Sequence, residues 1–256
     1  MTTKHAVRLA ALAALLLPAA GCAPDDPGQV ELSLAPLSGR EALATYVALG
    51  DGLTAGFMDA GLIATAAAPG NGQFASYPAQ LAAQIGYTGT AGARPFQQPR
   101  VHQPGVGTSD TGDPDLVAGV LRWDAQDAAI TLLGATPRAQ VPGLLDNARD
   151  PVPYDNLGVP GATIHDVAAA TGSGDSQAPG NAYFDLILRN PTFGGTTMLQ
   201  QAVGRAPTLV TLWIGEADIL GGARSGEPEI GVNITPPAAF GAMLGQLIAD
   251  LRAGVR

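Results

Sequence analysis

The sequence is poor in several residue types, and each shortage narrows what the chain can be. Its 256 residues include a single cysteine, so no internal disulfide can form. Only 14% of the residues are charged, and acidic residues outnumber basic ones by 22 to 13, which argues against a nucleic-acid partner. Only three histidines are available as bases near neutral pH. The sequence contains neither a glycine-rich phosphate loop nor a metal-ligand cluster, so it implies no cofactor.

The amino terminus has the layout of an export signal. Lys4 and Arg8 precede the apolar run Ala10–Ala20, and Gly21 and Cys22 follow directly. Basic, then apolar, then small residues are typical of a secretory signal, and the run is too short for a permanent membrane helix. The Ala-Ala-Gly-Cys ending resembles a bacterial lipoprotein signal, which implies acylation of Cys22 and an exported chain anchored by lipid to a cell-envelope membrane. The alternative is an ordinary signal peptide in which Cys22 is incidental.

We divide the chain accordingly into three parts. Residues 1–21 form the signal peptide, residues 22–40 form a solvated tether rich in proline and aspartate, and residues 41–256 form one domain. Residues 88–153 are the least regular part of that domain and are interpreted as an insertion.

Within the insertion, Leu116–Trp123 and Ala129–Leu133 are expected to pair as a β-hairpin. The stretch from Gly105 to Asp115 is rich in Gly, Ser, Asp and Pro and reads as a surface loop. A calcium site is the alternative interpretation, although the aspartate spacing and the closing glutamate of an EF-hand loop are missing.

The rest of the domain alternates strand and helix patterns, which predicts an α/β fold with a parallel sheet covered on both faces. For the last helix, Thr235 is expected to be the N-cap and Pro236 the first residue. The expected strands are residues 44–49, 154–159 and 208–214. The expected helices are residues 76–85, 163–170, 182–189, 197–203 and 235–254.

Each expected strand ends in a turn that contains glycine. The three blocks are Ala48–Gly56, Asn156–Thr163 and Leu212–Asp218. In this order they resemble the Gly-Asp-Ser-Leu, glycine oxyanion and Gly-x-Asn-Asp blocks of the SGNH/GDSL hydrolases, a family of lipases, esterases and acyl hydrolases. The resemblance implies a three-layer, flavodoxin-like fold and an acyl ester or glycan as the small-molecule partner. The positions that correspond to the family site are Asp51, Gly52, Gly161, Gly215, Ala217 and Asp218.

The departures from the family pattern bear on activity. Gly52 stands where the family has its serine nucleophile, Ala217 stands where it has the oxyanion asparagine, and no Asp-x-x-His block is found. An ester hydrolase of this kind needs a nucleophile and a base, so we expect the chain to be catalytically inactive. The backbone N–H groups of Gly52 and Gly161 remain available to polarise a carbonyl group.

Other residues near the turns are weaker candidates for catalysis. The hydroxyl of Thr54 is a candidate to replace the missing serine nucleophile, but capping of the following helix is the simpler interpretation. His165 is a candidate base at the edge of the site, but the simpler interpretation is a histidine on the exposed surface of a helix. Asp51, Glu216 and Asp218 together form a carboxylate cluster that could activate water, or they cap helix N-termini.

Three functions follow from these observations. The chain is an active or formerly active ester hydrolase, a lipid-anchored binding protein for an ester, glycan or acyl chain, or a structural envelope lipoprotein without a small ligand. Because an amphipathic helix closes just before Arg256, where a further strand is expected, we also expect the chain to be the front part of a longer reading frame.

Overall fold

The structure is a computed structural model that describes residues 39, 41–64, 72–87, 95–178, 180–190 and 192–255. All of them belong to one compact unit, Leu37–Arg256. The expected signal peptide, Cys22 and nearly all of the expected tether lie outside the described residues.

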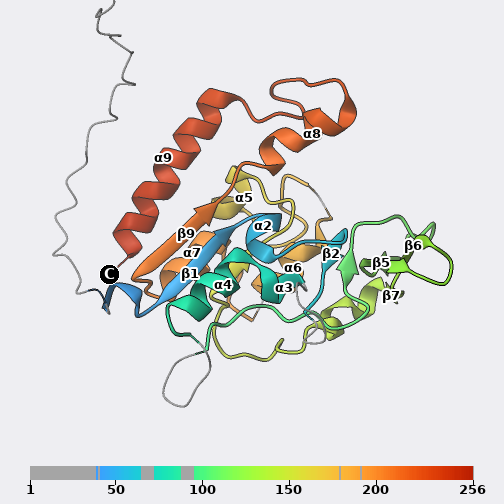
Figure 1. Ribbon diagram of the computed structural model, residues 1–256. Helices are drawn as coiled ribbons and strands as arrows, with labels where there is room; N and C mark the ends of the chain where they lie inside the picture. The colour runs from blue at the N-terminus through green and yellow to red at the C-terminus, as the bar shows by residue number, and fades with distance from the viewer. Residues whose placement is uncertain are drawn as a thin grey trace, which may run out of the picture. The chain divides into compact units, whose positions relative to one another are not determined.

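The centre of this unit is a three-stranded sheet (Figure 1). It consists of β1 (Tyr46–Gly50), β8 (Asn156–Gly158) and β9 (Leu209–Trp213), in the order β8-β1-β9. Both neighbours run parallel to β1, and the last residue of β1 is in register with the last residue of each neighbour. The predicted α/β class is therefore confirmed, and the three glycine-containing turns meet at one edge of the sheet.

The remaining elements are helices and small antiparallel strands. The 3₁₀ helices are η1 (Glu41–Leu43) and η2 (Arg138–Leu144). The α-helices are α2 (Gly52–Ala55), α3 (Gly72–Ala75), α4 (Tyr77–Gln84), α5 (Ile164–Ala169), α6 (Ala182–Leu188), α7 (Met198–Gly204), α8 (Ala217–Ser225) and α9 (Pro237–Gly254). The other strands are β2 (Gly61–Leu62), β3 (Val106–Gly107), β4 (Leu116–Ala118), β5 (Leu121–Asp124), β6 (Ala129–Leu132) and β7 (Ala135–Pro137).

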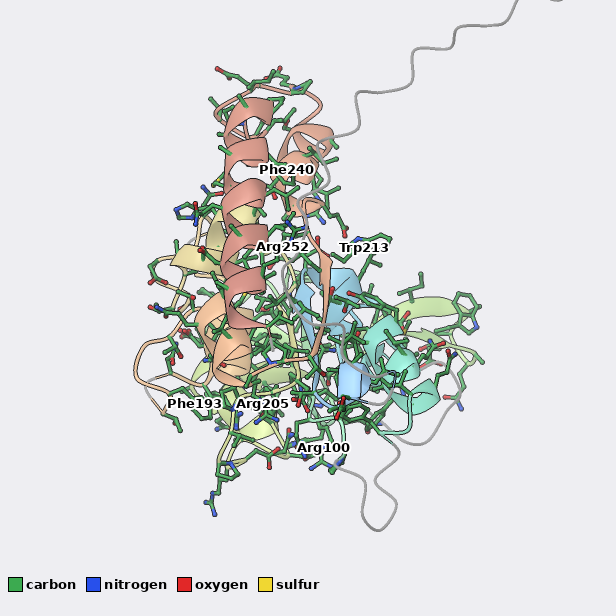
Figure 2. All side chains as sticks on the ribbon, turned by 90° about the vertical axis from the view of Figure 1, so that its left-hand side faces the viewer. Arg100, Phe193, Arg205, Trp213, Phe240 and Arg252 are labelled. Atoms are coloured by element: carbon green, nitrogen blue, oxygen red, sulfur yellow. The ribbon has the colours of Figure 1, made fainter. Side chains whose placement is uncertain are left out.

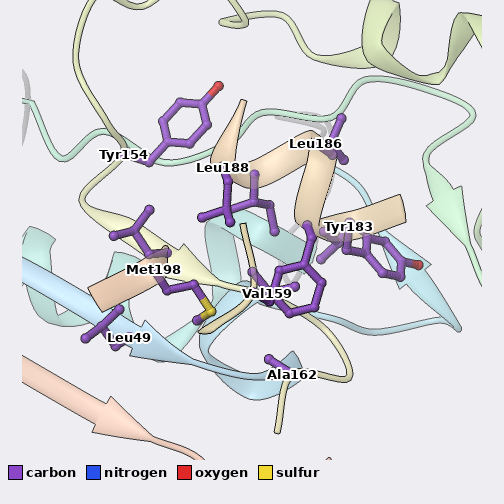
Figure 3. Close-up of a cluster of buried hydrophobic side chains, with 14 of the residues drawn as sticks. Leu49, Tyr154, Val159, Ala162, Tyr183, Leu186, Leu188 and Met198 are labelled. Atoms are coloured by element: carbon purple, nitrogen blue, oxygen red, sulfur yellow. The ribbon is translucent and has the colours of Figure 1, made fainter. Parts of the chain in front are cut away.

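Helices cover both faces of the sheet, as the sequence predicts. Val47 and Leu49 of β1 join a large core cluster to which α5, α6, α7 and α9 contribute, part of which Figure 3 shows. Tyr46 and Ala48 face the other way and pack with residues of α4 such as Ala82. Alternate side chains of a strand point to opposite faces, so every residue of β1 is buried.

Two helices, expected from the sequence, start at residues whose side chains cap them. Ser76 is the N-cap of α4, with its hydroxyl accepting from the N–H of Ala79. Thr163 caps α5 in a capping box with Asp166, in which side chain and backbone bond reciprocally. Local side-chain geometry decides both starts, which is why sequence alone could predict them.

The predicted cap of the last helix is wrong. The N-cap of α9 is Pro236, which makes no side-chain cap bond. Thr235 does not cap the helix, because its hydroxyl bonds instead to Asp218 Oδ1 at 2.7 Å.

The apolar stripe of α9 faces the core only in part. Leu247 and Leu251 are buried in the large cluster, and Phe240 packs against it, whereas Ile248 remains 37% exposed. Figure 2 shows α9 lengthwise, with Phe240 and Arg252 labelled. No helix in the described ranges is long and apolar enough to cross a bilayer.

The predicted hairpin of the insertion forms only in part. β5 pairs with β6 in antiparallel register around residues 125–128, as expected. Residues 116–118 do not continue that hairpin, because β4 pairs with β7 in a separate two-stranded sheet. The break falls at Gly119, where an added Cβ would meet the Pro104 carbonyl oxygen at 2.4 Å. Gly119 therefore lies close against another backbone segment, a tertiary contact that no local pattern reveals.

Candidate functional site

A cavity of about 790 Å³ lies at the carboxyl edge of the parallel sheet. Ligands of open α/β sheets bind at this edge. All three glycine-containing turns contribute to it: Asp51 and Gly52 after β1, Gly161 after β8, and Glu216 and Ala217 after β9. Parallel pairing therefore brings together residues that lie more than 160 positions apart in the chain.

The insertion supplies much of the remaining wall, which the sequence analysis missed. The stretch read as part of a surface loop contributes Val106, Thr108 and Ser109 to the cavity. The apolar pattern of this stretch is too short to indicate burial, so no sequence signal could have predicted that the stretch lines the cavity. Other lining residues are Phe57, Leu116, Val117, Arg138, Tyr183 and Arg224.

Asp51 is a buried acidic residue among those that line the cavity. It is 1% exposed and is the N-cap of α2, with Oδ1 accepting from the N–H of Leu53 at 3.4 Å. Its Oδ2 has no hydrogen-bond partner among the described residues. Burial first and the nearby charge of Glu216 second raise the pKa of the Asp51 carboxyl from 3.8 to about 6, although the backbone N–H groups of Leu53, Glu216 and Asp51 itself act to lower it.

We expect Asp51→Asn to make the protein more stable at pH 8 but not near pH 4. Unfolded Asp51 loses its proton near its ordinary pKa of 3.8, whereas folded Asp51 keeps it until about pH 6. The folded state therefore binds more protons between these values, and its stability falls as pH rises through this window. Asparagine is an equally good N-cap and stays neutral.

The expected gain is about 1–2 kcal/mol at pH 8. Urea denaturation of both proteins at several pH values between 4 and 8 measures it. If the two stability curves run parallel, Asp51 does not carry a raised pKa.

Thr54 does not line the cavity, and the expectation that it caps a helix is wrong. It lies inside α2, where Asp51 is the cap. Its buried hydroxyl lies 3.5 Å from the Leu49 carbonyl oxygen and 3.2 Å from the Tyr77 hydroxyl. A hydroxyl held within the core by these contacts is not presented to a ligand.

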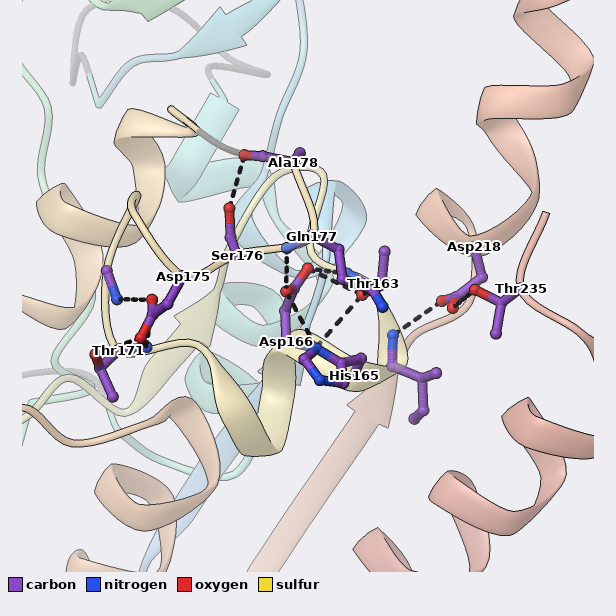
Figure 4. Close-up of polar contacts among 12 residues, drawn as sticks. Thr163, His165, Asp166, Thr171, Asp175, Ser176, Gln177, Ala178, Asp218 and Thr235 are labelled. Atoms are coloured by element: carbon purple, nitrogen blue, oxygen red, sulfur yellow. Dashed lines mark hydrogen bonds and ion pairs between the residues drawn. The ribbon is translucent and has the colours of Figure 1, made fainter. Parts of the chain in front are cut away.

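Asp218 and Gly215 also stay outside the cavity wall. Asp218 is buried, and its Oδ2 accepts from the N–H of Ile164 at the start of α5 while its Oδ1 accepts from Thr235 (Figure 4). Asp218 thus ties α8 to α5 and to the segment before α9. Gly215 has a φ of +116°, and an added Cβ would lie 3.1 Å from Phe240.

Histidine is absent from the described wall of the cavity. His165 lies on α5 with its side chain 43% exposed, and its Nδ1 is 3.8 Å from Asp166 Oδ1 (Figure 4). His102 pairs with Asp146 at 2.8 Å on the surface. Thr108 and Ser109 line the cavity, but no histidine is among the lining residues that the structure describes, so neither hydroxyl has a lining imidazole as its base.

The alternative of a calcium site gains no support. Within the described ranges, no group of three or more His, Cys, Asp or Glu residues could hold a metal ion.

Comparisons with protein-family models, curated proteins and solved structures found no match.

Proposed function

We propose that this chain is an exported, lipid-anchored relative of the SGNH/GDSL hydrolases that binds an acyl ester or glycan without hydrolysing it. The observation that carries the proposal is the cavity itself. Of the positions that carry the family resemblance it collects Asp51, Gly52, Gly161 and Ala217, yet it offers glycine at position 52, alanine at position 217 and no described histidine. Export and the anchor at Cys22 rest on the amino-terminal sequence.

The cavity has the chemistry to hold an uncharged acyl group. Phe57, Val106 and Leu116 offer apolar surface for the acyl chain. The N–H of Gly161 makes no hydrogen bond within the described residues, and the N–H of Gly52 starts a helix and has no intrahelical partner. These two donors would polarise the ester carbonyl but leave it intact, because nothing is placed to attack it.

Adding a large side chain at position 52 is expected to abolish ligand binding. Gly52→Leu would project into the cavity, and its Cβ meets only Phe57, at 3.4 Å, so the fold should tolerate it. Saturation-transfer NMR with ethyl butyrate measures binding. Gly174→Leu is the matched control, since an added Cβ there meets nothing within 4 Å and Gly174 does not line the cavity. Equal binding by parent and Gly52→Leu would refute this site.

Restoring a hydroxyl at position 52 is not expected to restore hydrolysis. Gly52→Ser provides an oxygen, but loss of the base alone costs about as much as loss of the whole triad, roughly 10⁶ in turnover. Turnover of 4-nitrophenyl butyrate should therefore stay at background for parent and variant. Substantial turnover by Gly52→Ser would show that a base is present, and the proposal of a non-catalytic site would then fail.

The Asp51–Glu216 pair favours one second candidate, a hydrolysis driven by carboxylates. Both residues line the cavity, and the raised pKa of Asp51 suits a general acid. Hydrolysis of 4-nitrophenyl glycosides by the parent, lost in Asp51→Asn, would favour this candidate over binding alone.

A further inference from the structure

The free oxygen of Asp51 is the feature of the cavity that the proposed function does not explain. A buried carboxyl oxygen normally has a hydrogen-bond partner, and an exception calls for a reason. Asp51 is one of the residues that line the cavity; its Oδ1 serves the helix cap, whereas its Oδ2 is buried with no hydrogen-bond partner in the described part of the chain. The helix cap uses only Oδ1, so capping does not explain why Oδ2 has no hydrogen-bond partner.

The charged groups around Asp51 come from several elements. Glu216, which follows β9, lines the same cavity, and although it occupies the N-cap position of α8 its side chain makes no cap bond. Arg138 from η2 and Arg224 from α8 line the wall as well, and Arg138 Nε donates to the Pro114 carbonyl oxygen. The residues of α2 and of the β8–α5 turn that line the cavity bring no charged side chain.

Of these groups, Glu216 is the one whose charge acts on Asp51. It disfavours a second negative charge, and neither arginine is among the causes that set the pKa of the Asp51 carboxyl. A negative charge near a buried carboxyl group favours the protonated form of that group. A carboxyl group that keeps its proton becomes a strong hydrogen-bond donor.

We propose that Asp51, in its acid form, is a ligand contact whose carboxyl O–H donates to an acceptor oxygen of a neutral ligand. The acceptor is the carbonyl oxygen of an ester or a ring or hydroxyl oxygen of a glycan. This inference rests on the proposed function and deepens it, because it names the side-chain atom that recognises the ligand. The negative charge of Glu216 disfavours an anionic ligand at this point of the cavity.

Binding should consequently weaken as pH rises. Above the pKa of about 6, Asp51 must take up a proton before it can donate. We expect the affinity for ethyl butyrate to fall at least about tenfold between pH 5 and pH 8. Asp51→Asn carries a permanent N–H donor and should bind equally at both pH values. Glu216→Gln should keep the pH dependence but move its midpoint to lower pH, because one charge that holds the proton on Asp51 is gone.

Saturation-transfer NMR titrations with ethyl butyrate at pH 5, 6, 7 and 8 test these expectations. Glu227→Gln is the control for loss of a carboxylate, since Glu227 is exposed and does not line the cavity, and its midpoint should match that of the parent. Parent binding that is equal at all pH values, or pH dependence that survives in Asp51→Asn, would overturn this inference and leave the proposed function standing. Absence of parent binding at every pH would overturn both.

Discussion

Arg205→Met is expected to destabilise the protein by roughly 2–3 kcal/mol, because it removes a cation that is hydrogen-bonded to a buried carboxylate. Arg205 follows α7, and its Nε and Nη2 donate to Asp155 Oδ1 at 3.1 and 2.9 Å. The Asp155 side chain is fully buried, and that of Arg205 is 10% exposed (Figure 2 labels Arg205). The N–H of Gln97 also donates to Asp155, at Oδ2, and does not depend on Arg205. Methionine keeps the length and the apolar contacts of the arginine stem.

Urea denaturation of parent and variant measures this loss. Arg122→Met is the matched control, because the Arg122–Asp124 pair spans 3.4 Å and its arginine is 54% exposed. Such exposed pairs contribute about 0–1 kcal/mol. Combining Arg205→Met with Asp155→Asn should recover part of the loss, since the buried charge is then gone. A loss below about 1 kcal/mol for Arg205→Met would mean that Asp155 does not depend on this arginine.

Gly158→Ala is expected to cost at least about 3 kcal/mol, and the variant should fail to accumulate as folded protein at elevated temperature. A Cβ at the end of β8 would meet the backbone nitrogen of Ala55 at 2.4 Å and the carbonyl carbon of Thr54 at 2.7 Å. Both are backbone atoms of α2, so no rotamer change can relieve the clash. Gly158 thus lets α2, and with it Asp51 and Gly52, sit directly on the strand.

Thermal denaturation followed by circular dichroism tests the requirement. Gly174→Ala is the control, because its added methyl group would lie in open space. If Gly158→Ala melts within about 2 °C of the parent, the close approach of α2 to β8 is not present in solution. A lowered melting temperature in Gly174→Ala as well would indicate a general sensitivity to loss of glycine instead.

The sequence by itself determined the elements whose cause is local. The apolar runs of β1 and β9, the hydroxyl of Ser76 and the Thr163–Asp166 capping box act within a few residues, so pattern and capping chemistry could locate them. The parallel sheet and the meeting of the three turns at one edge also followed, because alternating strands and helices leave few arrangements.

Tertiary structure alone decided which of the candidate residues face the cavity. Asp51, Gly52, Gly161, Glu216 and Ala217 line it, whereas Thr54, His165, Gly215 and Asp218 do not. Whether a residue next to a turn faces a cavity or the core depends on helix packing, and no one-dimensional pattern records that. Asp218 shows this plainly, since its partners lie 54 and 17 positions away.

The electrostatic environment of Asp51 could also be known only from the tertiary structure. Asp51 and Glu216 are 165 positions apart, yet their carboxyl groups share one cavity because β9 pairs with β1 in register. The pKa of Asp51 reflects burial first and this neighbour second, and both arise only when the chain is folded. The sequence specified a carboxylate at the end of a strand, and the fold turned it into a buried acid with one free oxygen.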